Sequence, residues 1–89
     1  MTASQADIVA MIARLVGFDP TSRLSNLDLI HDVAGYLKEH GIESHLIHDD
    51  EGSKANLYAS VGPADVPGIV LSGHTDVVPV DGQDWKTDP

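Results

Sequence analysis

Cysteine is absent from the 89 residues, so disulfide bonds and thiolate metal sites are excluded, and any metal ion must be held by His, Asp or Glu side chains. Basic residues are also few: 5 Lys and Arg stand against 14 Asp and Glu, which gives a formal net charge of −9. A chain with this charge repels phosphate backbones and anionic membrane surfaces. We therefore expect no nucleic acid and no membrane among its partners.

Long apolar runs are lacking as well. No stretch approaches the ~20 apolar residues that cross a bilayer, and no basic segment precedes a short apolar one as in a secretory signal peptide. We therefore expect a cytoplasmic location. Hydrophobic residues still make up 42% and charged residues 21% of the chain, which is typical of a chain that folds. At this length a single domain is the upper limit.

A first amphipathic helix is predicted near the start of the chain. Apolar residues recur at helical spacing over residues 8–16. Ser4 and Asp7 are placed as a capping box in front of them, and Gly17 is placed where a helix would end.

A second helix is predicted over residues 27–37, where apolar residues again recur at helical spacing. Ser25 with Asp28 is expected to open this helix, and Gly41 is expected to close it.

The pattern then changes from helical to extended. Residues 42–48 and 55–61 are short extended runs on either side of a polar turn, which predicts a hairpin or two adjacent strands. Ile69–Leu71 is an uninterrupted apolar run, typical of an internal strand covered on both faces. The order helix, helix, strand, strand, strand favours an α/β sheet. Residues 81–89 show no periodicity that predicts a helix or a strand. We therefore interpret the sheet that this chain forms as incomplete.

His74 and Asp76 are the strongest candidates for a functional site. They follow directly on the predicted internal strand, and the carboxyl end of a central strand is where α/β proteins present catalytic side chains. Because side chains alternate along an extended backbone, both should point to the same side. A neutral imidazole beside a carboxylate suits a divalent metal such as zinc, and Gly73 would let the backbone approach it closely. A His-x-Asp pair also arises by chance, so spacing alone leaves a surface role equally open.

Structural roles are favoured for the remaining candidates. His45 and His48 fall on opposite faces of a strand and are poor co-ligands. His31 and His40 can complement the dipole of the second helix, and the acidic run 49–51 fits a solvated turn. Ser22 and Ser72 have no partner arrangement that indicates a nucleophile, and Trp85 fits either the rim of a pocket or an exposed apolar position.

The segment Gly-Ile-Val-Leu-Ser-Gly-His-Thr-Asp-Val-Val-Pro, residues 68–79, resembles the first signature of the zinc-dependent acetylornithine deacetylase, succinyl-diaminopimelate desuccinylase and aminoacylase family. The similarity extends over essentially the whole chain. It includes Asp-Pro-Thr-Ser at 19–22, Tyr-Leu-Lys-Glu-His-Gly at 36–41, Ala-Asn-Leu at 55–57, and Trp85 with Asp88 and Pro89.

This resemblance implies a fold, a cofactor and roles for two residues. Residues 1–89 would form the amino-terminal portion of a catalytic domain with a mixed sheet covered by helices, and a second domain would lie outside this sequence. His74 would bind one of two Zn²⁺ ions, for which Co²⁺ could substitute, and Asp76 would be the catalytic-site aspartate that positions His74. The remaining ligands and the general base would lie beyond residue 89, so the isolated chain is expected to be inactive.

The implied reaction is removal of the acyl group from a small N-acyl amino acid, with N-acetylornithine, and hence arginine biosynthesis, as the first candidate. The full-length enzyme would be a homodimer. A dipeptidase, a carboxypeptidase or a desuccinylase of the same family is the second possibility. A small noncatalytic protein that binds a partner is the alternative from a different class.

Overall fold

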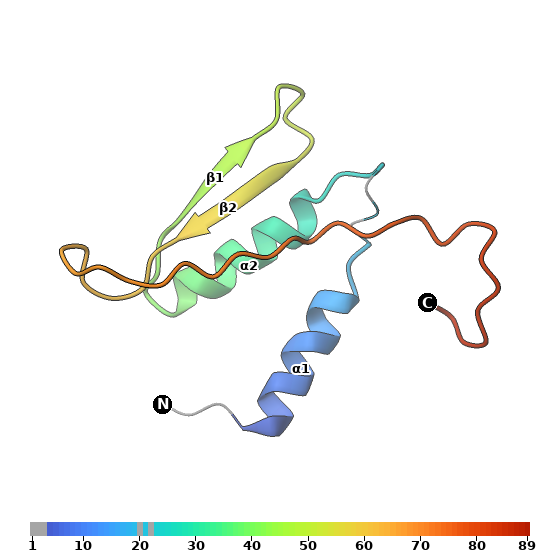
Figure 1. The fold of residues 1–89 in the computed structure, drawn as a ribbon, viewed down its shortest axis with the longest axis horizontal. Coiled ribbons are helices and arrows are strands. Elements are labelled where there is room, and N and C mark those ends of the chain that lie inside the picture. Colours follow the sequence, from blue (N-terminus) through green and yellow to red (C-terminus); the bar gives the residue numbers. More distant parts are fainter. Residues whose placement is uncertain (1–3, 20, 22) are drawn as a thin grey trace.

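The computed structural model describes residues 4–19, 21 and 23–89. Along the chain lie helix α1 (Gln5–Val16), helix α2 (Leu27–Glu39), strand β1 (Ser44–His48) and strand β2 (Ala55–Ala59). Figure 1 shows the β1–β2 hairpin on one side of α2, with α1 extending away from both. The chain is therefore an α/β fragment with an open sheet, as its sequence predicts.

Helix α1 begins with the predicted capping box. The Ser4 hydroxyl accepts a hydrogen bond of 3.1 Å from the backbone N–H of Asp7, and the Asp7 carboxylate accepts one of 3.1 Å from the backbone N–H of Ser4. The helix ends at Val16, directly before Gly17, so both predicted boundaries are confirmed.

Helix α2 ends as predicted but begins differently. Its N-cap is Asn26, and Ser25 lies one residue outside, where its hydroxyl accepts a bond of 3.1 Å from the Leu27 N–H. The helix therefore begins one residue later than predicted, while the Ser25 hydroxyl still satisfies the first backbone N–H of the helix. At the other end Gly41 has a φ of 76°, the left-handed conformation that glycine adopts after a helix.

The predicted hairpin is confirmed, with strands slightly shorter than expected. The strands are antiparallel and in register from Ser44 opposite Ala59 to His48 opposite Ala55. In the turn the Asp49 carboxylate accepts bonds from the backbone N–H groups of Ser53 and Lys54, at 2.9 and 3.1 Å. These bonds close the turn without help from the rest of the protein.

The hydrophobic core lies between α2 and the hairpin. Its buried members are Leu29 and Ile30 of α2 and Ala55 of β2. Partly buried apolar side chains surround them, namely Phe18, Leu27, Val33, Leu46 and Leu57. Helix α1 adds no buried residue. It is connected to α2 by Arg14, which donates two bonds of 2.8 Å to the Asp32 carboxylate and lies 5.6 Å from the centre of the Tyr36 ring.

The predicted third strand does not form. Ile69, Val70 and Leu71 are not assigned to a strand, and they are 90%, 80% and 93% exposed, so the prediction of an internal strand covered on both faces was wrong. A strand needs a neighbour for its backbone N–H and C=O groups, and within the described part of the chain β2 is paired with β1 alone. Further along, Thr21 and Val77 form an isolated parallel bridge, which holds this part of the chain beside the α1–α2 connection.

Pro20 and Ser22, which belong to the similarity at 19–22, lie outside the residues that the structure describes. No helix within the described ranges has both the length and the apolar character to cross a membrane.

Candidate metal centre

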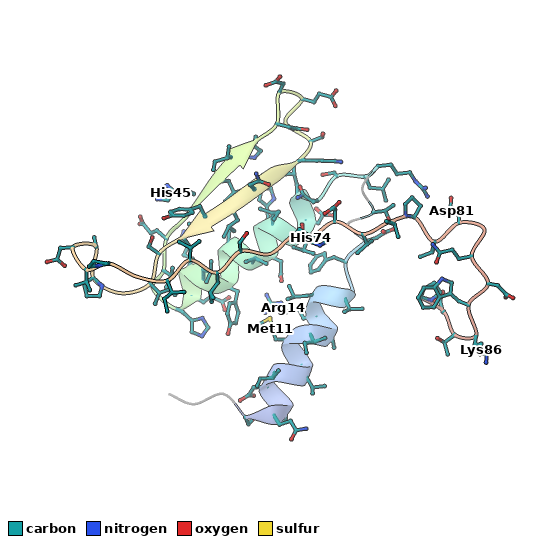
Figure 2. The ribbon with its side chains drawn as sticks, viewed as in Figure 1. Met11, Arg14, His45, His74, Asp81 and Lys86 are labelled. Carbon is teal, nitrogen blue, oxygen red and sulfur yellow. The ribbon has the colours of Figure 1, made fainter. Side chains whose placement is uncertain are left out.

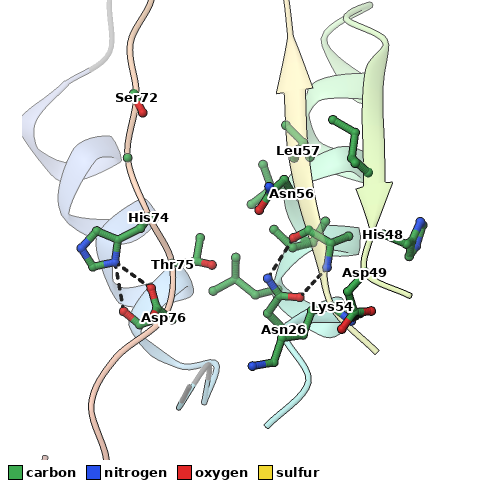
Figure 3. A pocket seen from close by; sticks show the side chains of 16 residues that line it. Asn26, His48, Asp49, Lys54, Asn56, Leu57, Ser72, His74, Thr75 and Asp76 are labelled. Atoms are coloured by element: carbon green, nitrogen blue, oxygen red, sulfur yellow. Dashed lines mark hydrogen bonds and ion pairs between the residues drawn. The ribbon is translucent and has the colours of Figure 1, made fainter. Parts of the chain in front are cut away.

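The structure brings His74 and Asp76 together. Nδ1 of His74 lies 3.0 Å from Oδ1 of Asp76 and 3.1 Å from the backbone oxygen of the same residue. Figure 3 shows these contacts, with the intervening Thr75 on the other side of the backbone. The predicted alternation of side chains therefore holds, although the segment is not part of a sheet.

The pairing fixes which nitrogen of His74 could bind a ligand. A carboxylate only accepts hydrogen bonds, so Nδ1 donates to Asp76, and the lone pair of a neutral imidazole is then on Nε2. This is the arrangement in which a carboxylate orients a metal-binding histidine. The side chains of His74 and Asp76 are 85% and 64% exposed, so water screens their interaction.

The pair lines a groove of about 770 Å³. Its other walls come from α2, from Asn26 before it and from the hairpin, including Leu57 of β2. The groove therefore separates the segment 72–76 from the edge of β2.

The residues present fit part of a zinc site. Imidazole nitrogen and carboxylate oxygen are suitable donors for Zn²⁺, but a catalytic zinc has three protein ligands and one open position. Within residues 4–19, 21 and 23–89 no group of three or more His, Asp or Glu side chains is close enough to hold a metal ion. His74 could thus supply one ligand, with Asp76 orienting it.

Of the other histidines, His48 at the end of β1 lines the same groove as the pair. His31, His40 and His45 are exposed and do not line it, and Nδ1 of His40 lies 2.9 Å from the backbone oxygen of Tyr36. Figure 2 shows His45 on the hairpin, apart from His74. None of these histidines belongs to a group of three or more His, Asp or Glu side chains among the described residues, and the structural roles favoured for them stay predictions.

Within the acidic run 49–51, Asp49 has a structural role. The backbone N–H of Lys54, and the backbone N–H and hydroxyl of Ser53, donate to the Asp49 carboxylate. These hydrogen bonds hold the pKa of the Asp49 carboxyl below its ordinary value. Asp49 is thus committed to closing the hairpin turn. Ser72 lines the groove, and the indole N–H of Trp85 donates to the Gln83 side chain at 2.8 Å.

Asn26 is the groove residue that sequence reasoning missed. Its side chain donates to the backbone oxygen of Ala55 at 2.9 Å and accepts from the Ala55 N–H at 3.0 Å. An asparagine before a helix normally indicates a cap, and nothing local in the sequence points to a partner 29 residues away.

The chain is similar to proteins named acetylornithine deacetylase. It is 41% identical over 73 residues to the one from Pasteurella multocida, covering 80% of this chain and 19% of that protein. It is 42% identical over 66 residues to the one from Photorhabdus laumondii, covering 73% and 17%. It is 34% identical over 71 residues to the one from Vibrio campbellii, covering 80% and 18%.

These matches confirm the resemblance to the acetylornithine deacetylase family. The chain spans less than one fifth of the length of these relatives. No family model matches the chain. No solved structure matches it either.

Proposed function

We propose that this chain supplies the first part of the active site of a zinc-dependent amidohydrolase that removes the acyl group from an N-acyl amino acid. N-acetylornithine is the first substrate candidate, because the similar proteins carry the name acetylornithine deacetylase. Arginine biosynthesis would then be its metabolic setting. The observation that carries the proposal is the contact of His74 Nδ1 with Asp76.

His74 would bind one zinc ion through Nε2, and Asp76 would hold the ring in that tautomer and orientation. A bound zinc polarises an amide carbonyl and lowers the pKa of a bound water. Asp76 contributes by fixing the imidazole before a metal arrives, so less conformational freedom is lost on binding. The remaining ligands and the general base would come from outside these residues, since His74 is one ligand of the three that a catalytic zinc requires.

The test is a chimera in which residues 1–89 replace the matching part of the Pasteurella multocida acetylornithine deacetylase. We expect the chimera to bind zinc and to hydrolyse N-acetylornithine. His74→Ala should lower zinc content and abolish turnover. Asp76→Asn should keep the fold and reduce metal affinity or activity by roughly 10- to 100-fold, the usual effect of losing an orienting partner.

His31→Ala is the matched control, because it removes an exposed imidazole from α2, away from the groove. It should retain both zinc and activity. Zinc content and kinetics that are unchanged in both His74→Ala and Asp76→Asn would refute the assignment. An active chimera that prefers N-succinyl substrates or dipeptides would replace the substrate but keep the site.

A further inference from the structure

The connection between α1 and α2 holds the chain directly beside the candidate site. Thr21 of this connection forms the isolated parallel bridge with Val77, and Val77 is the residue that follows Asp76. Thr21 is 8% exposed, and no other polar residue in the described part of the chain is buried. On the side of Thr21, the contact beside the candidate site is therefore a buried one.

A single peptide group joins this bridge to the candidate site. The carbonyl of Asp76 and the backbone nitrogen of Val77 belong to the same peptide, which is planar and nearly rigid. The oxygen of that peptide lies 3.1 Å from Nδ1 of His74. A bridge that holds Val77 in place therefore also restricts the direction in which the Asp76 carbonyl faces the imidazole.

Asp19 holds Thr21 in the conformation that forms the bridge. Oδ1 of Asp19 accepts a hydrogen bond from the Thr21 hydroxyl and one of 3.2 Å from the Thr21 backbone N–H. Without this acceptor a buried hydroxyl would lack a partner, which is costly. The same two bonds, the hydroxyl first, hold the pKa of Asp19 below its ordinary value, so the carboxylate stays ionised at neutral pH.

A second contact between the same two segments contributes less. The Arg23 guanidinium donates to both carboxylate oxygens of Asp81, at 3.0 and 3.1 Å. The two side chains are 54% and 70% exposed, and exposed ion pairs contribute little because water screens them. The contact at Thr21 is buried and lies nearer to the candidate site, so it has the larger effect on the site.

We infer that Asp19 is a positioning residue for the candidate zinc site. It acts through Thr21 and Val77, which hold the peptide group after residue 76 in the orientation that faces the imidazole. Nδ1 of His74 then stays hydrogen bonded, and Nε2 is left for the metal ion. The inference rests on the proposed function, because it needs His74 to bind zinc.

The experiment uses the chimera with the Pasteurella multocida enzyme, which contains all of these residues. Asp19→Ala should weaken zinc binding and lower kcat by about 3- to 10-fold, the equivalent of one lost hydrogen bond. KM for N-acetylornithine should stay nearly unchanged, because Asp19 does not touch the substrate. Competition with a chelator measures the zinc affinity, and steady-state kinetics separate kcat from KM.

Further variants separate positioning from folding. Asp19→Asn keeps Oδ1 as an acceptor, so it should restore zinc affinity and kcat. Asp65→Ala is the matched control, since it removes an exposed carboxylate that accepts no hydrogen bond from any residue that the structure describes, and it should behave like the parent. If Asp19→Ala does not fold, Thr21→Val takes its place: it removes the hydroxyl, keeps the shape of the side chain and should also weaken zinc binding.

Nitrogen NMR of the metal-free chimera reads the tautomer of His74 without zinc. The parent should carry the proton on Nδ1, and Asp19→Ala should shift the population toward the form protonated on Nε2. A purely structural role of Asp19 would lower the melting temperature but leave this population and the zinc affinity of the folded protein as in the parent.

The outcomes distinguish the inference from the proposed function. If His74→Ala keeps zinc and activity, the zinc site itself is refuted, and with it the role of Asp19. If His74→Ala loses zinc while Asp19→Ala retains the parent's zinc affinity and tautomer, the inference alone is overturned. Equal losses in Asp19→Ala and Asp19→Asn would also overturn it, because the asparagine keeps the acceptor.

Discussion

Leu29 and Leu71 are the same residue in two different regions of the molecule, and they are 6% and 93% exposed. Leu29 lies in α2 opposite the hairpin, so its partners are supplied within the next 30 residues of the chain. Leu71 lies in the run Ile69–Leu71, which is at least as apolar as α2 and shortly precedes the candidate metal ligand His74. Nothing among the described residues covers this run. An apolar run therefore indicates that a segment needs burial, and only the neighbours determine whether it is buried.

The largest effect that this comparison predicts is on stability. Leu29→Ala should lower the free energy of unfolding by about 2–5 kcal/mol, because it leaves a cavity in a core with few other members. A domain of this size has a total stability of about 4–13 kcal/mol, so the loss would be a large share. Leu71→Ala should change the free energy of unfolding by no more than about 0.5 kcal/mol.

Urea denaturation followed by circular dichroism, at a protein concentration low enough for a monomer, would measure both. Equal destabilisation by the two substitutions would mean that residues 68–73 are packed in solution, against the structure.

The accuracy of the sequence predictions follows the same division. The capping box at Ser4 and Asp7, the end of α2 before Gly41 and the hairpin turn depend on residues within a few positions of one another, and all were predicted. The Ile69–Leu71 strand depends on partners that no local pattern specifies, and it does not form.

The candidate site divides in the same way. Side-chain alternation predicted that His74 and Asp76 would meet, because only one residue separates them. Asn26 and Ala55 are 29 residues apart, and their contact could not be predicted from spacing. The metal role of His74 stays a prediction, because the other ligands it requires are not among the described residues.

The next largest effect concerns Asn26, which connects the two parts of the core. Asn26→Ala should lower the free energy of unfolding by roughly 1–3 kcal/mol, because it leaves the backbone N–H and C=O of Ala55 without partners at a partly buried position. Hydrogen exchange at the Ala55 amide should accelerate more than at Asp49, whose N–H donates to the Lys54 carbonyl. Asn56→Ala removes an exposed amide from the neighbouring position and should have little effect. If both variants exchange equally fast, the Asn26 bridge does not stabilise β2.

The smallest effect is the dependence of stability on pH through Asp32. Hydrogen bonds from the Arg14 guanidinium hold the pKa of Asp32 below its ordinary value of about 3.9. A carboxyl whose pKa is lower in the folded than in the unfolded chain stabilises the fold above the unfolded pKa, and this contribution is lost as the pH falls through the folded pKa. Asp32→Asn should therefore reduce stability at pH 6 and make the decline in stability below about pH 4 shallower.

Asp65→Asn makes the same change of charge at an exposed carboxylate that accepts no hydrogen bond among the described residues, so it should leave the dependence of stability on pH close to that of the parent. Urea midpoints between pH 2.5 and pH 6 would compare the three proteins. Because the side chains of Arg14 and Asp32 are 43% and 26% exposed, water screens their interaction, and the difference should be well below that of Asn26→Ala. An Asp32→Asn curve parallel to that of the parent would show that Arg14 and Asp32 do not hold α1 against α2 in solution.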